Sequence, residues 1–240
     1  MKSILELYAR LIAAKAGDID AISVRPDKPF QWASGTHNPI YNDNRLHLWH
    51  PINRRLIACA MAEYMQANGI APKFIAGTST AGISPGTTLA DMMNLPFVYV
   101  RDKPKDHGMR NQIEGIPAES DLGGMVGVVY EDLISTGGSS AKTVQAVRNA
   151  NGKVNHCLCI FSYDLPAALK MFSGEITYDS KDPTQPKLDP SCRIGAMLTY
   201  PQLIEFNKDQ FTPEQLKALA EWREDQANWG DKQGFPSVKK

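Results

Sequence analysis

Apolar side chains recur with helical spacing in two stretches of the chain, residues 3–16 and residues 51–68. Apolar residues that lie three and four positions apart fall on one face of a helix, so both stretches predict amphipathic helices. Pro51 suits the first turn of the second helix, and Asn68-Gly69 supplies its end. The first half of the chain therefore begins with helical, not strand-like, periodicity.

From residue 74 onward, short apolar runs alternate with helical patterns. The runs typical of buried strands are 74–76, 97–100, 126–130 and 154–161. The helical patterns between them occupy 86–94 and 138–150. This alternation predicts an α/β fold, in which a central parallel sheet is flanked by helices. Ligands then bind at the carboxyl ends of the strands.

The last quarter of the chain contains one segment without periodicity and one clear helix. Residues 174–193 are rich in Pro, Asp, Ser and Lys and are expected to form a loop or a small excursion. Thr212-Pro213-Glu214-Gln215 combines an N-cap, a proline in the first turn and a capping-box glutamine. A final helix is expected to begin there.

Composition limits the classes of partner. Of 240 residues, 26 are basic and 26 acidic, so no nucleic acid or anionic membrane partner is expected. No stretch approaches the roughly 20 apolar residues of a membrane span, and charges near the N-terminus interrupt any signal-peptide core, so a cytoplasmic protein is expected. The four cysteines form no C-x-x-C pair and are interpreted as buried, reduced thiols.

Residues 127–139 present a strand, an acidic pair, a glycine turn and a helix start, in that order. Backbone N–H groups of such a turn, together with the N-terminus of a helix, form a cradle for a phosphate group. Glu131 and Asp132 are expected at the carboxyl end of the strand, where carboxylates accept hydrogen bonds from ribose hydroxyls or approach magnesium. The alternative is a strand that ends in a solvated acidic turn. Neither a Walker loop nor G-x-G-x-x-G is present.

The run Glu-Asp-Leu-Ile-Ser-Thr-Gly-Gly-Ser resembles the signature of the type I phosphoribosyltransferases. In that family the acidic pair contacts the ribose of phosphoribosyl pyrophosphate (PRPP), and the next residues hold its 5′-phosphate. The resemblance implies that PRPP is bound by Glu131, Asp132, Leu133, Ile134, Ser135, Thr136, Gly137, Gly138 and Ser139, with Asp132 also catalytic. The turn 77–82 resembles the pyrophosphate-binding turn of this family, and the alternative for it is a helix cap.

A basic loop follows the predicted strand 97–100. Cations that close over a departing pyrophosphate stabilise the transition state, which makes Arg101, Lys105 and His107 candidates for PRPP binding and Lys105 and His107 candidates for catalysis. The alternative is a solvated charged loop. The run Arg-x-Lys-Pro-Lys-x-His-Gly resembles the catalytic loop of bacterial orotate phosphoribosyltransferases, although Asp102 stands where many members have a second basic residue. In that family the loop reaches the partner subunit's site, which implies a homodimer.

Residues 30–45 are dense in aromatic and turn-forming residues. Tyr41 offers a surface on which a flat ring can stack, and Ser34 offers a polar group for its edge, although a structural turn is the alternative. Asp43 and Arg45 are expected to pair. The run Ser-Gly-x-x-x-Pro-Ile-Tyr-x-Asp-x-Arg resembles the orotate-binding loop of orotate phosphoribosyltransferases, and Ser135 matches a residue that contacts orotate in that family.

The resemblance implies the type I fold in a single domain, residues 1–240. The core is expected over about 49–173, with a small hood built from about 1–48 and 174–240. It also implies transfer of a phosphoribosyl group from PRPP to N1 of orotate in pyrimidine biosynthesis. Mg²⁺ is expected to be held mainly by PRPP, and Asp132 is the one candidate for a protein ligand. Two alternatives remain: transfer to another nucleobase, and a regulator that senses PRPP without catalysis.

Three positions leave recognition of the orotate carboxylate open. Ala33 and Ala81 stand where lysines often occur in the family, and Leu165 stands where an orotate-contacting arginine can appear. No contact is therefore assigned to these three residues, and backbone amides are the alternative partners of the carboxylate.

Overall fold

A computed structural model describes residues 21–32, 34–101, 112–117, 119–178 and 186–237. The predicted helix 3–16 and the catalytic candidates Lys105 and His107 lie outside these described residues.

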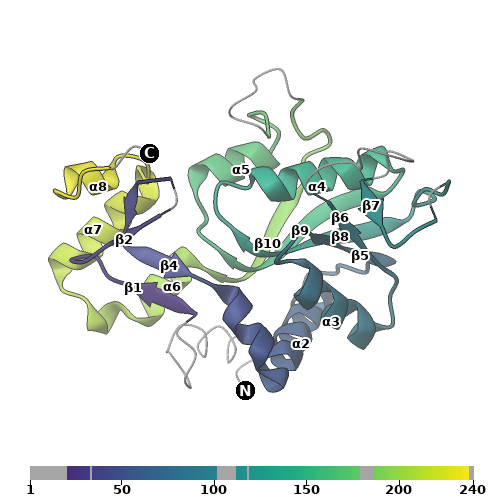
Figure 1. Cartoon of the computed structure of the whole chain (residues 1–240), viewed down its shortest axis with the longest axis horizontal. Helices are drawn as coiled ribbons and strands as arrows, with labels where there is room; N and C mark the ends of the chain where they lie inside the picture. The colour runs from purple at the N-terminus through teal and green to yellow at the C-terminus, as the bar shows by residue number, and fades with distance from the viewer. Residues whose placement is uncertain (1–20, 33, 102–111, 118, 179–185, 238–240) are drawn as a thin grey trace.

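A six-stranded sheet forms the centre of the molecule, with strand order β10-β9-β8-β5-β6-β7 (Figure 1). The strands are β5 (Phe74–Thr78), β6 (Phe97–Val100), β7 (Ile113–Glu114), β8 (Val126–Ile134), β9 (Lys153–Ser162) and β10 (Arg193–Thr199). The first five in this order, from β10 to β6, run parallel, and β7 pairs antiparallel with β6. The predicted central parallel sheet is confirmed, with one short antiparallel strand added at its edge.

Helices cover both faces of this sheet. Helices α2 (Pro51–Ala67) and α3 (Ile83–Met93) lie on one side, and α4 (Gly138–Asn149) and α5 (Pro166–Phe172) lie on the other (Figure 1). Successive side chains of a strand point to opposite faces, so alternate residues enter two separate cores. Val128 and Tyr130 belong to the first core, and Val129 belongs to the second. This two-sided burial explains why the strands read as continuous apolar runs.

Three of the four cysteines lie in the second of these cores. Cys157, Cys159 and Cys192 are buried free thiols, as expected, and burial raises the pKa of each. Cys59 departs from the prediction because it is only half-buried, and its Sγ lies 3.6 Å from the sulfur of Met92.

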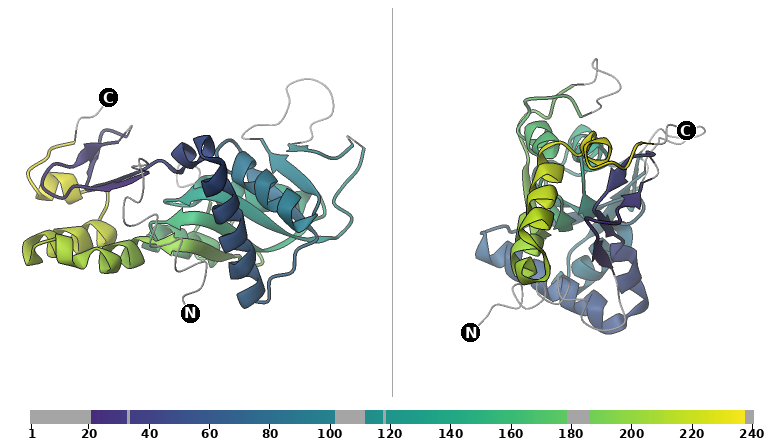
Figure 2. Two further views of the ribbon diagram at one scale, coloured as in Figure 1. Left: turned by 90° about the horizontal axis from the view of Figure 1, so that it is seen from below. Right: turned by 90° about the vertical axis from the view of Figure 1, so that its left-hand side faces the viewer.

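The hood lies at one side of the sheet (Figures 1 and 2). It contains β1 (Ile22–Val24), β2 (Phe30–Gln31), β3 (His37–Asn38) and β4 (Ile40–Asn42), followed by α6 (Tyr200–Phe206), η2 (Lys208–Gln210), α7 (Pro213–Glu224) and α8 (Trp229–Lys232). Strand β1 pairs with β4, and β2 pairs with β3. The short helix η1 (Asn44–Trp49) leads from the hood into α2.

Several elements differ from the sequence-based prediction. Strand β8 continues to Ile134, so Glu131 and Asp132 lie inside the strand and not after it. Strand β10 lies within 174–240, the range expected for the hood, yet it forms an edge of the central sheet. Its residues 194–198, Ile-Gly-Ala-Met-Leu, form a short apolar run that the sequence-based prediction did not assign to a strand. Helix α7 begins at Pro213 with the predicted capping box at Thr212.

Candidate functional site

The predicted phosphate loop connects β8 to α4. Gly137 has a φ of 87°, in the left-handed region that favours glycine, and a Cβ atom there would lie 3.0 Å from the ring of Phe172. Helix α4 begins at the next residue, and among the described residues no side chain caps its N-terminus. Because the first amides of a helix lack internal partners, this end offers N–H donors to an anion. The binding of a phosphate group at this turn stays a prediction.

Glu131 is turned toward α4 and away from solvent. Its carboxylate accepts hydrogen bonds from the Ser140 hydroxyl at 3.1 Å and from the backbone N–H of Asp132 at 3.0 Å, and the residue is only 6% exposed. Burial, followed by the nearby charge of Asp132, raises the pKa of Glu131 to about 9. The side chain therefore holds a proton more readily than an exposed glutamate does.

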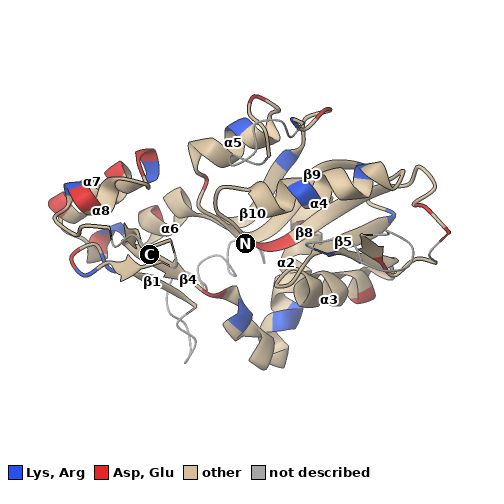
Figure 3. Cartoon of the chain, turned by 45° about the horizontal axis from the view of Figure 1, so that its top comes forward, with Lys and Arg blue, Asp and Glu red and all other residues tan. Residues whose placement is uncertain are grey.

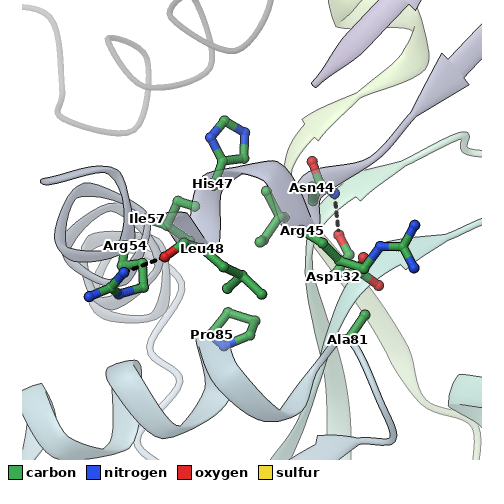
Figure 4. Close-up of a pocket in the computed structure, with 10 residues that line it drawn as sticks. Asn44, Arg45, His47, Leu48, Arg54, Ile57, Ala81, Pro85 and Asp132 are labelled. Carbon is green, nitrogen blue, oxygen red and sulfur yellow. Dashed lines mark hydrogen bonds between the residues drawn. The ribbon is translucent and has the colours of Figure 1, made fainter. Parts of the chain in front are cut away.

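Asp132, one position further, faces the opposite side of the strand. It lines a small pocket together with Asn44, Arg45 and Ala81 (Figure 4). The Asn44 side-chain amide donates a hydrogen bond of 2.8 Å to the carbonyl oxygen of Asp132, which fixes the strand against η1. Burial raises the pKa of Asp132, and the side-chain hydrogen bond to Glu131 and the charge of Arg45 oppose this effect. The two carboxyl groups thus interact with each other while they contact different neighbours, and the contact of both with ribose stays a prediction.

Arg45 and Asp43 form the pair expected from the sequence. The Arg45 guanidinium donates to both Asp43 oxygens, at 2.6 and 2.8 Å, and this contact lowers the pKa of Asp43. A bidentate pair of this kind holds both groups in one orientation. It fixes the guanidinium at the rim of the Asp132 pocket.

The turn after β5 lies directly beside the acidic strand. A Cβ atom on Gly82 would lie 2.4 Å from the carbonyl oxygen of Tyr130 and 2.9 Å from that of Thr78. The peptide bond between Ser79 and Thr80 is cis. Only glycine allows so close an approach of the turn to β8, and this brings Ala81 to the pocket that Asp132 lines.

Three residues predicted to contact a nucleobase line a single pocket. Ser34 and Tyr41 come from the hood and Ser135 from the phosphate loop, and the pocket volume is about 390 Å³. The remaining lining residues are Gln31, Trp32, Asn42, Leu133 and Tyr163. A volume in this range accommodates a small planar ligand. The structure therefore brings together the two halves of the predicted base site.

Aromatic packing holds the hood against this pocket. Trp222 of α7 is fully buried, its indole N–H donates a 2.8 Å hydrogen bond to the Asn38 side chain, and its ring lies 5.4 Å from that of Tyr163. Arg223 donates to the Asp164 carboxylate at 2.9 Å. Both contacts join residues of the C-terminal hood to the end of β9, so the pocket wall depends on α7.

The base of the predicted basic loop is a short antiparallel pairing. The backbone N–H of Arg101 donates to the carbonyl oxygen of Gln112 at 3.0 Å, and the Gln112 side chain donates to the carbonyl oxygen of Arg101 at 2.7 Å. The guanidinium of Arg101 lies 3.6 Å from Glu114. The base of the loop thus lies at the carboxyl end of β6, next to the end of β5.

Charge in the central sheet is sparse. Figure 3 shows acidic residues on β8 in the middle of a mostly uncharged sheet, whereas α7 and α8 carry many charges. Within the described ranges no three acidic, histidine or cysteine side chains form a metal-binding group. Magnesium commonly takes one or two carboxylates and completes its shell with substrate phosphates and water, so the Asp132 carboxylate fits that role.

None of the helices described here has the length and hydropathy needed to span a bilayer.

Comparison with known proteins agrees with the geometry. The chain is 41% identical over 223 residues to an orotate phosphoribosyltransferase of Streptococcus pneumoniae (serotype 19F, strain G54), which covers 92% of this chain and 97% of that protein. Its identity to an orotate phosphoribosyltransferase of Lactococcus lactis subsp. lactis is 40% over 223 residues, or 92% of this chain and 98% of that protein. The chain belongs to the orotate phosphoribosyltransferase family. Models of known protein families give no match.

Solved structures of the orotate phosphoribosyltransferase family and its relatives share the fold. The orotate phosphoribosyltransferase of Aeropyrum pernix has a TM-score of 0.63 at 21% identity, covering 84% of this chain and 99% of that chain. The UMP synthase of Leishmania donovani has a TM-score of 0.65 at 20% identity, covering 92% of this chain and 42% of that chain. At these identities the likeness concerns the fold, which is the expected type I phosphoribosyltransferase fold.

The sequence analysis did not identify some of the residues that line the two pockets. Asn42 is the last residue of β4, Tyr163 directly follows β9, and Asn44 begins η1 two positions after β4. Asn42 and Tyr163 line the base pocket, and Asn44 lines the Asp132 pocket. Position at a strand's carboxyl end was the available signal for Tyr163, which follows β9. Leu165, where some members have arginine, is buried in the core at 3% exposure.

Proposed function

We propose that this chain transfers the 5-phosphoribosyl group from PRPP to N1 of orotate, releasing pyrophosphate and forming orotidine 5′-monophosphate for pyrimidine biosynthesis. The observation that carries this proposal is the shared pocket of Ser34, Tyr41 and Ser135, which adjoins the phosphate loop. Family membership supports it, because curated relatives at 40–41% identity bear this activity in their names.

The residues of β8 and the loop after it are proposed to bind PRPP. The amides of residues 135–139 and the hydroxyls of Ser135, Thr136 and Ser139 would hold the 5′-phosphate at the start of α4. Asp132 would accept hydrogen bonds from the ribose hydroxyls. Leu133 and Ile134 carry the chain from the acidic pair into this cradle, and Glu131 anchors the strand through Ser140.

Magnesium is proposed as the cofactor. Bound with PRPP, it would neutralise charge on the pyrophosphate. The Asp132 carboxylate is the described protein group suited to reach it, through the pocket that Asp132 shares with Ala81. The relatives' names do not mention a metal, so this assignment rests on the chemistry of the ligands.

The basic loop is proposed to stabilise the departing pyrophosphate. Arg101, Lys105 and His107 would supply positive charge there, and the loop would act across a homodimer, as its resemblance to the family's catalytic loop implies. The strand pairing that fixes the loop's base at the carboxyl end of β6 supports its reach toward the site.

The test is the loss of orotate absorbance when the protein is mixed with orotate, PRPP and magnesium, with hypoxanthine and uracil in parallel. We expect magnesium-dependent consumption of orotate alone. Asp132→Asn, which keeps the side chain's size, should lower kcat by about a hundredfold or more, within the range typical of a lost electrostatic contact. Consumption of another base in place of orotate, or PRPP binding without any turnover, would refute the proposed activity.

A further inference from the structure

The backbone of Asp132 lies on a part of β8 where one of the two neighbouring strands has stopped pairing. Strand β5 pairs with β8 as far as Tyr130, whereas β9 pairs with it as far as Ile134. Backbone N–H and C=O groups along an edge without a strand partner need other hydrogen bonds where water is kept away. Beyond Tyr130, side chains can take the place of the missing strand.

Side chains supply partners to both backbone groups of Asp132. The Asn44 Nδ2 atom donates to the Asp132 carbonyl oxygen at 2.8 Å (Figure 4), and the Asp132 N–H donates to the Glu131 carboxylate at 3.0 Å. Asn44 is buried, and its Oδ1 atom has no partner among the described residues. The bond to Asp132 is thus the one side-chain hydrogen bond that Asn44 makes within them.

Asn44 is itself held in place by the residues on either side of it. The N–H of Asp43 donates to the carbonyl oxygen of Ala21 at 2.7 Å. The Asp43 carboxylate caps η1 by accepting from the backbone N–H of Arg45 at 3.2 Å, and it also holds the Arg45 guanidinium. The Asn44 amide therefore approaches β8 from a braced segment of backbone.

The orientation of this backbone decides where the Asp132 carboxylate points. Turning a peptide unit swings the Cα–Cβ bond of its residue, so the hydrogen bond that holds the Asp132 carbonyl oxygen also restrains the side chain. That side chain lines its pocket together with Arg45 and Ala81. A misplacement of about 1 Å can lower the rate at a reacting site by about a hundredfold. One hydrogen bond to the backbone of Asp132 is therefore enough to affect turnover.

We propose that Asn44 is a positioning residue of the transfer reaction, which acts by holding the Asp132 carboxylate toward the ribose of PRPP. This inference rests on the proposed function, in which Asp132 accepts hydrogen bonds from the ribose hydroxyls. Asn44 itself touches no substrate. Because it acts through Asp132, its contribution to turnover disappears when the Asp132 carboxylate is removed, whereas a contribution to the fold alone persists.

A double-mutant cycle with Asp132→Asn tests this dependence. Asn44→Leu keeps the approximate size of the side chain and removes the donor. We expect it to lower kcat by at least about tenfold in the native background and by no more than about twofold in the Asp132→Asn background. Its loss of Tm should be the same in both backgrounds, because the Asp132 carbonyl oxygen loses its donor in either case.

Asn207→Leu is the matched control. The Asn207 Nδ2 atom donates to the carbonyl oxygen of Leu203 at 2.9 Å, which is the same kind of bond, and Asn207 lines neither of the two pockets. This variant should lower Tm, because a carbonyl oxygen again loses its donor, and should leave kcat within about twofold of the native value.

The two backgrounds separate a positioning role from a structural one. Equal factors in kcat for Asn44→Leu in both backgrounds would overturn the inference, and so would a lowered Tm with unchanged kcat. If Asn44→Leu does not fold, the smaller substitution Asn44→Ser is taken through the same cycle with the same criteria. A native protein that consumes no orotate would instead refute the proposed function.

Discussion

Glu131 and Asp132 show how two adjacent carboxyl groups acquire different properties from one strand. Alternation turns Glu131 toward Ser140 of α4 and turns Asp132 toward the pocket beside Ala81. The sequence indicated an acidic pair that acts as a unit at the end of a strand. It did not indicate that β8 continues past the pair, because the polar letters at 131 and 132 interrupt the apolar run on which the prediction depended.

The protonation of Glu131 leads to a prediction about stability. Its pKa is raised to about 9 from an ordinary value of 4.5, so between these values the folded chain keeps a proton that the unfolded chain releases. Stability should therefore fall as pH rises through this window. Glu131→Gln stays neutral throughout, so its Tm relative to the native protein should rise by more than about 4 °C from about pH 5 to pH 9, a shift that corresponds to roughly 1 kcal/mol.

Thermal unfolding of both proteins at several pH values gives the measurement. Asp91→Asn, a substitution at an exposed carboxyl group, serves as the control and should follow the native curve. Parallel curves for the native protein and Glu131→Gln would show that Glu131 ionises normally in the fold.

At the scale of elements, the sequence predicted those with strong periodicity and missed those whose stability comes from neighbours. Helix α2, strand β5 and helix α4 were expected, because each carries its own apolar pattern. Strand β7 has only two residues and exists through its pairing with β6, which no local pattern encodes. The site elements were among the predictable ones, since a phosphate cradle needs glycines and hydroxyls next to each other in the chain.

The turn between β5 and α3 depends on one glycine. Alanine at position 82 would place its Cβ 2.4 Å from the Tyr130 carbonyl oxygen, and neither backbone can yield without moving the turn. We expect Gly82→Ala to raise the KM for PRPP by at least about tenfold, since displacements of about 1 Å at a positioned site have effects of up to about a hundredfold. The measurement is steady-state kinetics with PRPP varied.

Gly69→Ala is the matched control for this substitution. Gly69 has a φ of 66°, and its Cβ would meet nothing within 4 Å, so alanine there introduces backbone strain alone. It should lower stability by about 1–2 kcal/mol without changing the KM for PRPP. An equal rise of that KM in both variants would mean that the effect of Gly82→Ala comes from general destabilisation.

At the scale of the whole molecule, the base pocket exists only where the hood meets the core. Its walls come from residues 31–42 and from residues 133–163, and α7 holds the two together through Trp222 and Arg223. The sequence predicted Ser34, Tyr41 and Ser135 through family resemblance, but spacing along the chain cannot show which distant segments meet. Tyr163 and Asn42 were missed for that reason.

Trp222→Phe tests whether the hood sets the shape of this pocket. Phenylalanine keeps most of the packing but removes the indole N–H, which leaves the Asn38 Oδ1 atom buried without its donor and should cost about 1–3 kcal/mol. Because Tyr163 packs against both Trp222 and Trp32, we expect the KM for orotate to rise by about threefold or more, with less change for PRPP.

Trp49→Phe is the control, since Trp49 is 85% exposed and should tolerate the change. If Trp222→Phe lowers Tm but leaves the KM for orotate unchanged, the pocket keeps its shape independently of α7, and base recognition must then reside in residues 31–42 and the phosphate loop alone.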